Sequence, residues 1–182
     1  NVCNGVTSAD SASSLFAYNA ILELTGPEGI RQVPIQEFYT GPGKTVRRHE
    51  EVMTAIRIRR RDYEGYTGCY IKYGKRNAME IATLGCACLV KLSWDKKVVE
   101  DMRIAYGVAA PTPVRCPETE KSVSGQAVSN ALLLQTGKGV LNEVNPRTSW
   151  RASKEFRLQL VEELAKRAMA QAIRNGGGEV DA

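Results

Sequence analysis

Two alternating runs near the middle of the chain constrain its fold more than any other feature. In Thr83–Leu92, "TLGCACLVKL", apolar side chains recur at every second residue, and Val98–Val108, "VVEDMRIAYGV", repeats the pattern. A period of two predicts β-strands. The segment between them, Ser93–Lys97, has the length and composition of a turn. The two runs therefore predict an antiparallel meander with one covered face.

A long helix near the C-terminal end offers cover for that face. It is predicted from Ser153, a suitable N-cap, to Arg174, and the "NGGG" that begins at Asn175 should end it. Its apolar row consists of Phe156, Leu160, Leu164 and Ala168, with Val161, Ala165 and Ala172 beside it. Its predicted outward row consists of Arg157, Lys166, Arg167 and Arg174.

Two shorter helical segments precede the long helix. One begins at Pro117, and the other lies within 127–144, where Gly137 and Gly139 would each cost about 1 kcal/mol inside a helix. A small antiparallel sheet covered by a bundle of three helices is an α+β arrangement. The α+β class is therefore the predicted fold class of this part of the chain.

The first third of the chain predicts one helix and three further strands. The helix begins near Asp10, the strands lie in 20–25, 30–35 and 52–58, and the "GPEG" after the first strand indicates a hairpin. In the last of these strands the predicted half-buried positions are Val52, Thr54, Ile56 and Ile58. A polar, aromatic stretch around residue 62 divides the chain into predicted domains 1–62 and 63–176, followed by a tail, 177–182.

The segment Gly41–Thr45, "GPGKT", resembles part of a phosphate-binding loop. That motif requires a first glycine five residues before the second one, and Phe38 stands there. It also requires a buried strand before the loop and a helix directly after it, whereas a polar, β-branched stretch follows. We therefore interpret the segment as a surface loop between two elements.

Cysteine and histidine content limits the chemistry. The cysteines are Cys3, Cys69, Cys86, Cys88 and Cys116, an odd number without a Cys-x-x-Cys pair. This pattern favours a reducing, cytoplasmic compartment over a secreted disulfide framework. Cys86 and Cys88 share one face of a strand, either as metal ligands or as small core residues, and the absence of a second pair nearby favours the core. With His49 as the single histidine, most histidine-based catalytic and metal sites are excluded.

Composition excludes two classes of partner. The 182 residues are 43% apolar and 25% charged, as in an ordinary globular protein. No apolar run approaches the roughly 20 residues of a membrane span. The net charge of +5 is mild and scattered, which argues against nucleic acid as a partner.

Two residues have a possible ligand role that the pattern leaves open. Lys72 lies in a strand-like run and either holds the charge of a cofactor or is an ordinary edge lysine. Asp10 either accepts a hydrogen bond from a ligand hydroxyl or caps its helix. Since the acidic residues are scattered singly, the residues alone predict no self-contained catalytic site and no metal site.

Five segments, taken in order, resemble the FAD-binding medium subunits of the molybdenum hydroxylases, most closely those of bacterial xanthine dehydrogenases. They are "NVCNGVTSADSA", "TGPGKT", "KYGKRNAMEIATLGCA", "GVAAPTPVRC" and "NPRTSWRASKEFRLQLV". They extend over nearly the whole chain with even spacing, so chance similarity is a poor explanation.

The resemblance implies an electron-transfer function in an oxidoreductase complex. In such enzymes a molybdenum–pterin subunit oxidises a purine or another N-heterocycle, 2Fe–2S clusters on a further subunit pass on the electrons, and FAD delivers them to NAD or another acceptor. None of the five cysteines fits an iron–sulfur ligand pattern, in agreement with clusters on a partner subunit.

The resemblance also implies that residues 1–62 are the C-terminal half of an FAD-binding subdomain, including a remnant of its antiparallel sheet. Residues 63–176 would be the complete C-terminal flavoprotein domain. The family's Ala-Gly-Gly and Thr-x-Gly-Gly loops, which approach the FAD pyrophosphate, are absent from the sequence. We therefore expect a fragment of a larger subunit that is inactive by itself. The alternative is a cofactor-free docking module for partner subunits.

The cofactor-binding residues implied by the resemblance are Asn1, Cys3, Asp10, Met53 and Lys72. Asn1 and Cys3 would touch FAD, and Asp10 would accept from a ribityl hydroxyl. Met53 would pack on the flavin, and Lys72 would lie near the isoalloxazine ring, followed by a flanking loop through Ala82.

Two departures from the family pattern concern the electron acceptor. Pro42 stands where relatives that reduce NAD carry a tyrosine, and Ala78 and Met79 stand where they carry acidic residues. The sequence therefore leaves open whether NAD or another molecule accepts the electrons.

Overall fold

The two alternating runs form the centre of a five-stranded antiparallel sheet. The structure, a computed structural model, describes residues 1–180. The strands of this sheet are β6 (Tyr66–Tyr73), β7 (Leu84–Leu92), β8 (Val98–Gly107), β9 (Val114–Arg115) and β10 (Gln126–Ala127). Their order is β10-β8-β7-β6, with β9 also paired to β8. The predicted meander is thus present, and β6 adds a further antiparallel strand at one edge.

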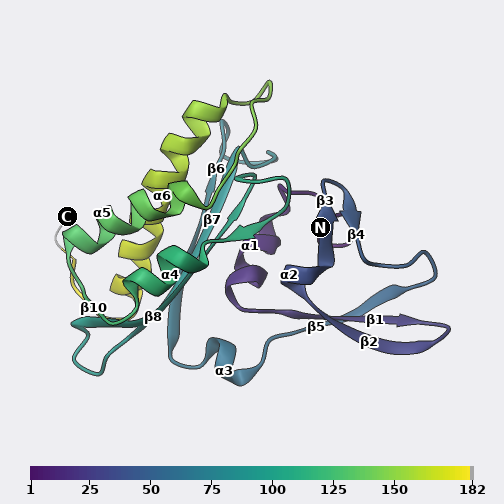
Figure 1. Ribbon diagram of the computed structural model, residues 1–182, viewed down its shortest axis with the longest axis horizontal. Coiled ribbons are helices and arrows are strands. Elements are labelled where there is room, and N and C mark those ends of the chain that lie inside the picture. The colour runs from purple at the N-terminus through teal and green to yellow at the C-terminus, as the bar shows by residue number, and fades with distance from the viewer. Residues whose placement is uncertain (181–182) are drawn as a thin grey trace.

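Three helices and a short 3-10 turn cover one face of this sheet (Figure 1). They are α4 (Pro117–Val123), α5 (Asn130–Gly139), η1 (Val140–Asn142) and α6 (Lys154–Asn175). The Oγ of Ser153 accepts a hydrogen bond from the N–H of Phe156 and so caps α6 as predicted. The predicted α+β class, with an antiparallel sheet covered by three helices, is confirmed.

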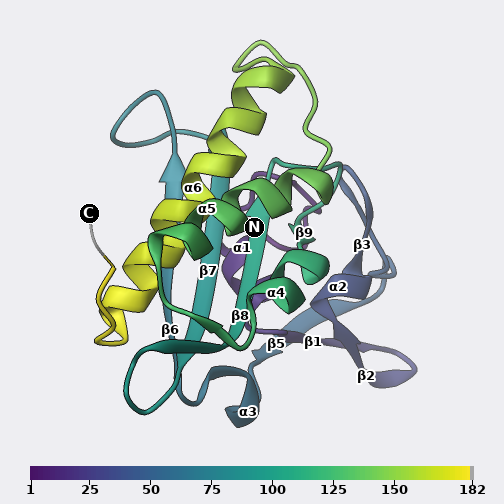
Figure 2. The same ribbon diagram turned by 60° about the vertical axis from the view of Figure 1, so that its left-hand side comes forward.

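The first part of the chain contains a smaller sheet and three short helices. The helices are α1 (Asp10–Ala17), α2 (Ile35–Phe38) and α3 (Arg60–Tyr63). The strands β1 (Ile21–Gly26), β2 (Gly29–Pro34) and β5 (Val52–Arg57) form a sheet of order β2-β1-β5, and β3 (Tyr39–Gly41) pairs with β4 (Lys44–Thr45). In both views the small sheet lies on the side of the molecule opposite to α5 and α6 (Figures 1 and 2).

The large sheet is covered on both faces, which corrects the prediction of one covered face. Leu84, Cys86, Cys88 and Val90 of β7 point to the helical core, whereas Ala87 and Leu89 pack with α1 in a second core. The second face was missed because Gly85 and Ala87 are small and look like an uncovered face, whereas Ala87 and Leu89 pack against α1 in the structure.

The predicted burial of β5 is wrong. Val52, Thr54 and Ile56 are exposed, and the partly buried residues of this strand are Met53 and Ala55. The pairing between β1 and β5 shifts register at Glu23/Leu24, so the alternation of β5 does not map onto one face of the sheet. Alternation in the sequence therefore located the strand without identifying its covered side.

Arg157 is a second correction. The helical periodicity of the sequence places Arg157 on the outward face of α6. Its side chain is nevertheless 2% exposed and is the largest fully buried side chain in the described part of the protein. Lys166, Arg167 and Arg174 remain at least partly exposed, as predicted.

The chain after α6 returns to the helical core. A Cβ on Gly178 would lie 2.7 Å from Cγ2 of Ile173, and Val180 is buried in the same core. Of the predicted tail, 177–182, residues 181–182 lie outside the described residues.

Candidate functional site

An ion pair between the start of α1 and the edge strand β6 is the centre of the candidate site. Lys72 Nζ lies 2.8 Å from Asp10 Oδ2. Lys72 and Tyr70 share one face of β6, since they are two residues apart, and this face is turned towards α1. Gly85 of β7 pairs with Lys72, and a Cβ there would lie 3.2 Å from the Tyr70 hydroxyl. The absence of a side chain at Gly85 therefore makes room for Tyr70 beside the ion pair.

Tyr70 is a neutral donor at this site. Its hydroxyl makes a long contact of 3.5 Å with Asp10 Oδ1. The pKa of Tyr70 is raised to about 12, mainly by burial of the phenol and secondly by the negative charge of Asp10. The phenol consequently stays protonated at neutral pH. Sequence reasoning missed Tyr70, although its place two residues before Lys72 in the same strand puts both side chains on one face.

Asn1 joins the same region through the first turn of α1. Its Oδ1 accepts hydrogen bonds from the N–H of Ser11, at 3.3 Å, and from the Oγ of Ser11, at 2.8 Å. Asp10 is the first residue of the helix, whose N-cap is Ala9 and has no side-chain hydrogen bond. Of the two open interpretations of Asp10, capping of its own helix is therefore wrong.

Cys3 and Met53 lie on other elements. Cys3 is exposed in the N-terminal loop, near Tyr39. The pKa of Tyr39 is raised to about 12, mainly by burial of the phenol and to a smaller extent by the charge of Cys3. Met53 lies opposite Leu24 in the small sheet and packs against the second core. Among the five predicted residues, the structure thus brings Asn1, Asp10 and Lys72 together around the start of α1.

The loop 74–83 borders Lys72. Glu80 Oε2 accepts from the N–H of Arg76 at 2.5 Å, and Arg76 Nη2 donates to the carbonyl of Met79 at 2.8 Å. The backbone N–H groups of Arg76 and Lys75, and more weakly the charges of Arg76 and Lys72, lower the pKa of Glu80. A Cβ on Gly74 would lie 2.4 Å from Glu80 Oε2, so a side chain there would displace the Glu80 carboxylate from its bond to the N–H of Arg76.

A cleft of about 210 Å³ lies between the N-terminal loop, the β3–β4 turn and the loops after β8 and η1. Its lining includes Thr7, Pro42, Val108, Pro111, Asn145 and Arg147. Backbone hydrogen bonds tie its walls together: Val108 N–H donates to Thr7 at 3.1 Å and Asn145 N–H donates to Ala109 at 2.9 Å.

The "GPGKT" segment forms one wall of this cleft and is no phosphate-binding loop. It is the turn of the β3–β4 hairpin, with Gly43 at φ +69°. The N–H of Gly43 donates to the carbonyl of Gly5 at 2.9 Å, and a Cβ on Gly5 would lie 2.9 Å from the backbone nitrogen of Lys44. The interpretation as a loop between two elements is correct, since a tight hairpin packed on backbone cannot surround a phosphate.

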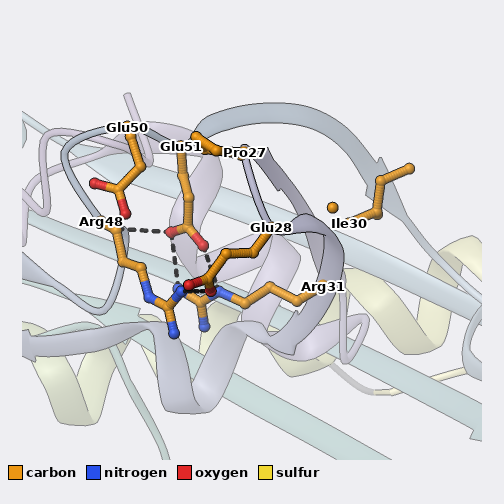
Figure 3. Close-up of a pocket in the computed structure, with 9 residues that line it drawn as sticks. Pro27, Glu28, Ile30, Arg31, Arg48, Glu50 and Glu51 are labelled. Atoms are coloured by element: carbon orange, nitrogen blue, oxygen red, sulfur yellow. Dashed lines mark hydrogen bonds and ion pairs between the residues drawn. The ribbon is translucent and has the colours of Figure 1, made fainter.

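A further pocket, of about 120 Å³, lies at the β1–β2 turn (Figure 3). Four of its five charged side chains form ion pairs: Arg31 with Glu51 at 2.6 Å and Arg48 with Glu28 at 2.5 Å. These internal ion pairs give the pocket a structural role in holding the turn to the segment that carries Arg48 and Glu51.

Residues 1–180 hold neither a cluster of metal ligands nor a helix that could span a membrane. Cys86 and Cys88 are fully buried, as expected of small core residues, and burial raises the pKa of the Cys88 thiol. No group of three or more candidate metal ligands is found among these residues. None of their helices has the length and apolar character needed to cross a membrane.

Two protein families match consecutive parts of the chain. Residues 1–59 match the FAD binding domain in molybdopterin dehydrogenase, and residues 69–172 match the CO dehydrogenase flavoprotein C-terminal domain.

Individual relatives agree with both matches. The chain is 42% identical over 180 residues to a xanthine dehydrogenase FAD-binding subunit from Escherichia coli O157:H7, covering 99% of this chain and 61% of that protein. It is 31% identical to the glyceraldehyde dehydrogenase medium chain of Sulfolobus acidocaldarius, covering 91% of this chain and 59% of the relative. The chain thus spans about three fifths of the length of these relatives.

A solved structure shares the fold. It is a carbon monoxide dehydrogenase from Hydrogenophaga pseudoflava that lacks the Mo-pyranopterin moiety of the molybdenum cofactor. It superposes with a TM-score of 0.87 at 26% identity, over 96% of this chain and 59% of that one.

Proposed function

The chain belongs to the family of FAD-binding medium subunits of the molybdenum hydroxylases, and on this premise we propose that it is part of a subunit that binds FAD and transfers electrons. The proposed parent enzyme is a xanthine dehydrogenase-like oxidoreductase of purine metabolism. A molybdenum-binding subunit and an iron–sulfur subunit would be its partners. A cytoplasmic location, expected from the cysteine content, belongs to the same proposal.

The observation that carries this proposal is the Asp10–Lys72 pair beside Tyr70 and the start of α1. FAD presents ribityl hydroxyls, which need acceptors, and a ring system whose reduced form carries negative charge and favours a nearby cation. The carboxylate of Asp10, the amide oxygen of Asn1 and the ammonium of Lys72 provide these groups. The donor set of the site therefore fits the cofactor.

Each predicted residue has a proposed task. Asp10 uses Oδ2 for Lys72, while its Oδ1 has a single long contact, so this oxygen can accept from a ribityl hydroxyl. Lys72 holds a positive charge near the isoalloxazine ring. Asn1 and Cys3 contact the cofactor from the N-terminal loop, and Met53 packs on the flavin.

FAD, when bound, supplies the exchange between one-electron and two-electron transfer. The residues of this chain orient it and set the charge around it. We propose that the cleft beside Pro42 admits the electron acceptor, either NAD or another molecule, because it opens between the hairpin and the loop that carries Arg147.

The division into domains 1–62 and 63–176 is part of the proposal. Two hydrophobic cores support it, one made largely by the first part of the chain and one by the second.

The alternative of a cofactor-free docking module is favoured by a row of exposed side chains on the small sheet. In this row Thr25 pairs with Ile30 on one side and with Val52 on the other, and these two apolar residues are 66% and 64% exposed.

Substitution of Lys72 by methionine in the full-length protein tests the flavin role. The variant should keep its flavin but lose a charge that stabilises the reduced form. We expect the midpoint potential of the flavin to fall by about 30 mV or more, measured by spectroelectrochemical titration. Lys91→Met is the matched control, because Lys91 lies at the other end of the sheet, near Tyr66 and Glu100, and should leave the potential unchanged.

Two results would contradict the proposal. One is a purified full-length protein without flavin, which would favour the docking module. The other is the same midpoint potential in the Lys72→Met variant and the unsubstituted protein, which would remove Lys72 from the site.

A further inference from the structure

Arg157 is a buried cation without a buried anion. It lies in the first turn of α6, and no carboxylate within residues 1–180 forms an ion pair with it. Burial, and then the charges of Arg147 and Arg151, lower the pKa of its guanidinium. A buried charge is seldom the most stable choice for a core position, because apolar residues of similar volume often serve as well or better. Stability alone therefore does not explain this residue.

The partners of Arg157 are backbone carbonyls and one hydroxyl from two separate loops. Its Nε donates to the carbonyl of Thr83 at 3.3 Å. Its Nη1 donates to the carbonyls of Arg147 and Ala152, and its Nη2 donates to Ser149 Oγ at 2.8 Å. A planar guanidinium spreads five donors over three nitrogens and so reaches all four of these acceptors, whereas an ammonium has three donors on a single nitrogen.

The first of these loops, 74–83, borders the Asp10–Lys72 pair. Its last residue, Thr83, is held through both of its backbone groups, since its N–H donates to the carbonyl of Tyr73 at 2.9 Å and its carbonyl accepts from Arg157. Between these ends the loop carries Glu80, whose pKa responds to the charge of Lys72. Met79, at its tip, is 95% exposed. The Thr83 peptide is therefore the anchor that relates this loop to α6.

The second loop, 143–153, forms a wall of the cleft beside Pro42. Asn145 and Arg147 line the cleft, and Asn145 N–H is bonded to Ala109. A turn closed by the Ser149–Ala152 bridge follows, and Arg157 binds both bridge residues as well as Arg147 ahead of the turn. The position of this wall therefore depends on the same guanidinium that holds Thr83.

We propose that Arg157 is a positioning residue that joins the loop beside Lys72 and the wall of the cleft into one mechanical unit. In the flavin-binding subunit proposed above, this would keep the cofactor side and the acceptor side of the site in a fixed relation. The relevance to electron transfer rests on the proposed function. The coupling of the two loops does not rest on the proposed function, because it can be measured in the absence of flavin and of enzyme turnover.

Hydrogen–deuterium exchange in the full-length protein tests the coupling. With Arg157→Met, we expect amides in both 74–83 and 143–153 to exchange about tenfold faster or more, while the small sheet and the C-terminal half of α6 keep their protection. Arg157→Lys should restore part of the protection in one loop. Arg167→Met, on the exposed side of the same helix, and Thr83→Val, which removes a buried hydroxyl without a hydrogen-bond partner, are the controls and should change neither loop.

Ser149→Ala keeps the test decisive if Arg157→Met fails to fold, because it removes a neutral hydroxyl and leaves the charge in place. We expect faster exchange in its own loop and also in 74–83, with an unchanged free energy of global unfolding. Addition of guanidinium at low concentration to Arg157→Ala should restore protection in both loops together. A change confined to 143–153 in Ser149→Ala, or a uniform loss of protection throughout the domain in Arg157→Lys, would overturn the proposal.

Failure of this test and failure of the flavin test are separate results. If Lys72→Met leaves the flavin potential unchanged but both loops respond to Ser149→Ala, the coupling stands and the proposed function falls. If the potential shifts as expected and only one loop responds, the proposed function stands and Arg157 is a local support.

Discussion

Glu51 shows how one side chain can fasten two segments. Its carboxylate accepts from Arg31 Nε at 2.6 Å and Nη2 at 2.9 Å, and from the N–H of Arg48 at 2.6 Å (Figure 3). These bonds, with the one from Arg31 the largest contribution, lower the pKa of Glu51 to about 2. The carboxylate is thus bound in its charged form in the folded state.

The lowered pKa predicts a pH dependence of stability. Because the folded pKa is about 2 and the ordinary value is 4.5, the contribution of Glu51 is complete above pH 4.5 and is lost as the pH falls towards 2. Glu51→Gln should therefore lower the free energy of unfolding at neutral pH and flatten its decline in that acidic range. Denaturant unfolding at a series of pH values measures both effects.

Glu28→Gln is the control for this prediction. Glu28 belongs to the same pocket, but its side chain is 83% exposed, and a surface pair of this kind contributes little. Equal slopes for Glu51→Gln and the unsubstituted protein would show that Glu51 does not stabilise the turn through its charge.

At the scale of elements, the contacts of α5 with α6 and with α4 explain two glycines that the helix pattern disfavours. Both Gly137 and Gly139 are in α5. A Cβ on Gly137 would lie 3.0 Å from the carbonyl oxygen of Glu162, and one on Gly139 would lie 2.8 Å from Thr119 Oγ1. The helix tolerates the glycines because they permit a close approach to α6 and α4.

Gly137→Ala tests this explanation. Alanine would favour the helix by about 1 kcal/mol, but the clash with backbone of α6 should cost about 2 kcal/mol. We expect a net loss of about 1 kcal/mol in the free energy of unfolding, measured in denaturant. Leu134→Ala, at an exposed position of the same helix, should stay within about 0.5 kcal/mol. A more stable Gly137→Ala variant would mean that the two helices move apart easily.

At the scale of the whole molecule, Asn19 links the elements of the two cores. Its Nδ2 donates to Asp62 Oδ1 at 3.1 Å, and its Oδ1 accepts from Gln36 at 3.0 Å and from Arg115 at 2.6 Å. Arg115 in turn pairs with Glu120 of α4 at 2.5 Å. Asn19 also has φ +48°, a left-handed conformation that asparagine tolerates better than most residues.

Asn19→Ala and Asn19→Gly should therefore lower the free energy of unfolding by different amounts. Both variants lose three hydrogen bonds, but alanine adds about 1 kcal/mol of backbone strain that glycine avoids. We expect Asn19→Ala to lower the free energy of unfolding by about 2 to 3 kcal/mol and Asn19→Gly by about 1 kcal/mol less. Denaturant unfolding measures the difference, and equal losses would show that the backbone conformation at Asn19 is unstrained.

Sequence reasoning was most successful where a pattern is local. The strands of the meander, the N-cap of α6 at Ser153 and the core position of Cys86 were correctly predicted, because each depends on spacing or on a neighbouring residue. At the candidate site, the local pattern makes Lys72 and Asp10 candidate ligand residues, and their roles towards FAD, implied by the family resemblance, stay predictions. Their contact was not predicted, because a strand edge and a helix start 62 residues apart meet only through the fold.

By itself, the sequence determined the class of the fold, its longer helices and strands and the exclusion of a phosphate-binding loop at "GPGKT", but not the short elements α2, α3, β3, β4, β9 and β10. Only the tertiary structure decided which faces are covered. Val52 is exposed because of a register shift in its sheet, and Ala87 is buried because α1 lies above it. Arg157 is buried because carbonyls from two loops, one of them 74 residues away, satisfy a guanidinium that the helical pattern places in solvent. Periodicity records the polarity of a face, whereas burial depends on what the rest of the chain brings against it.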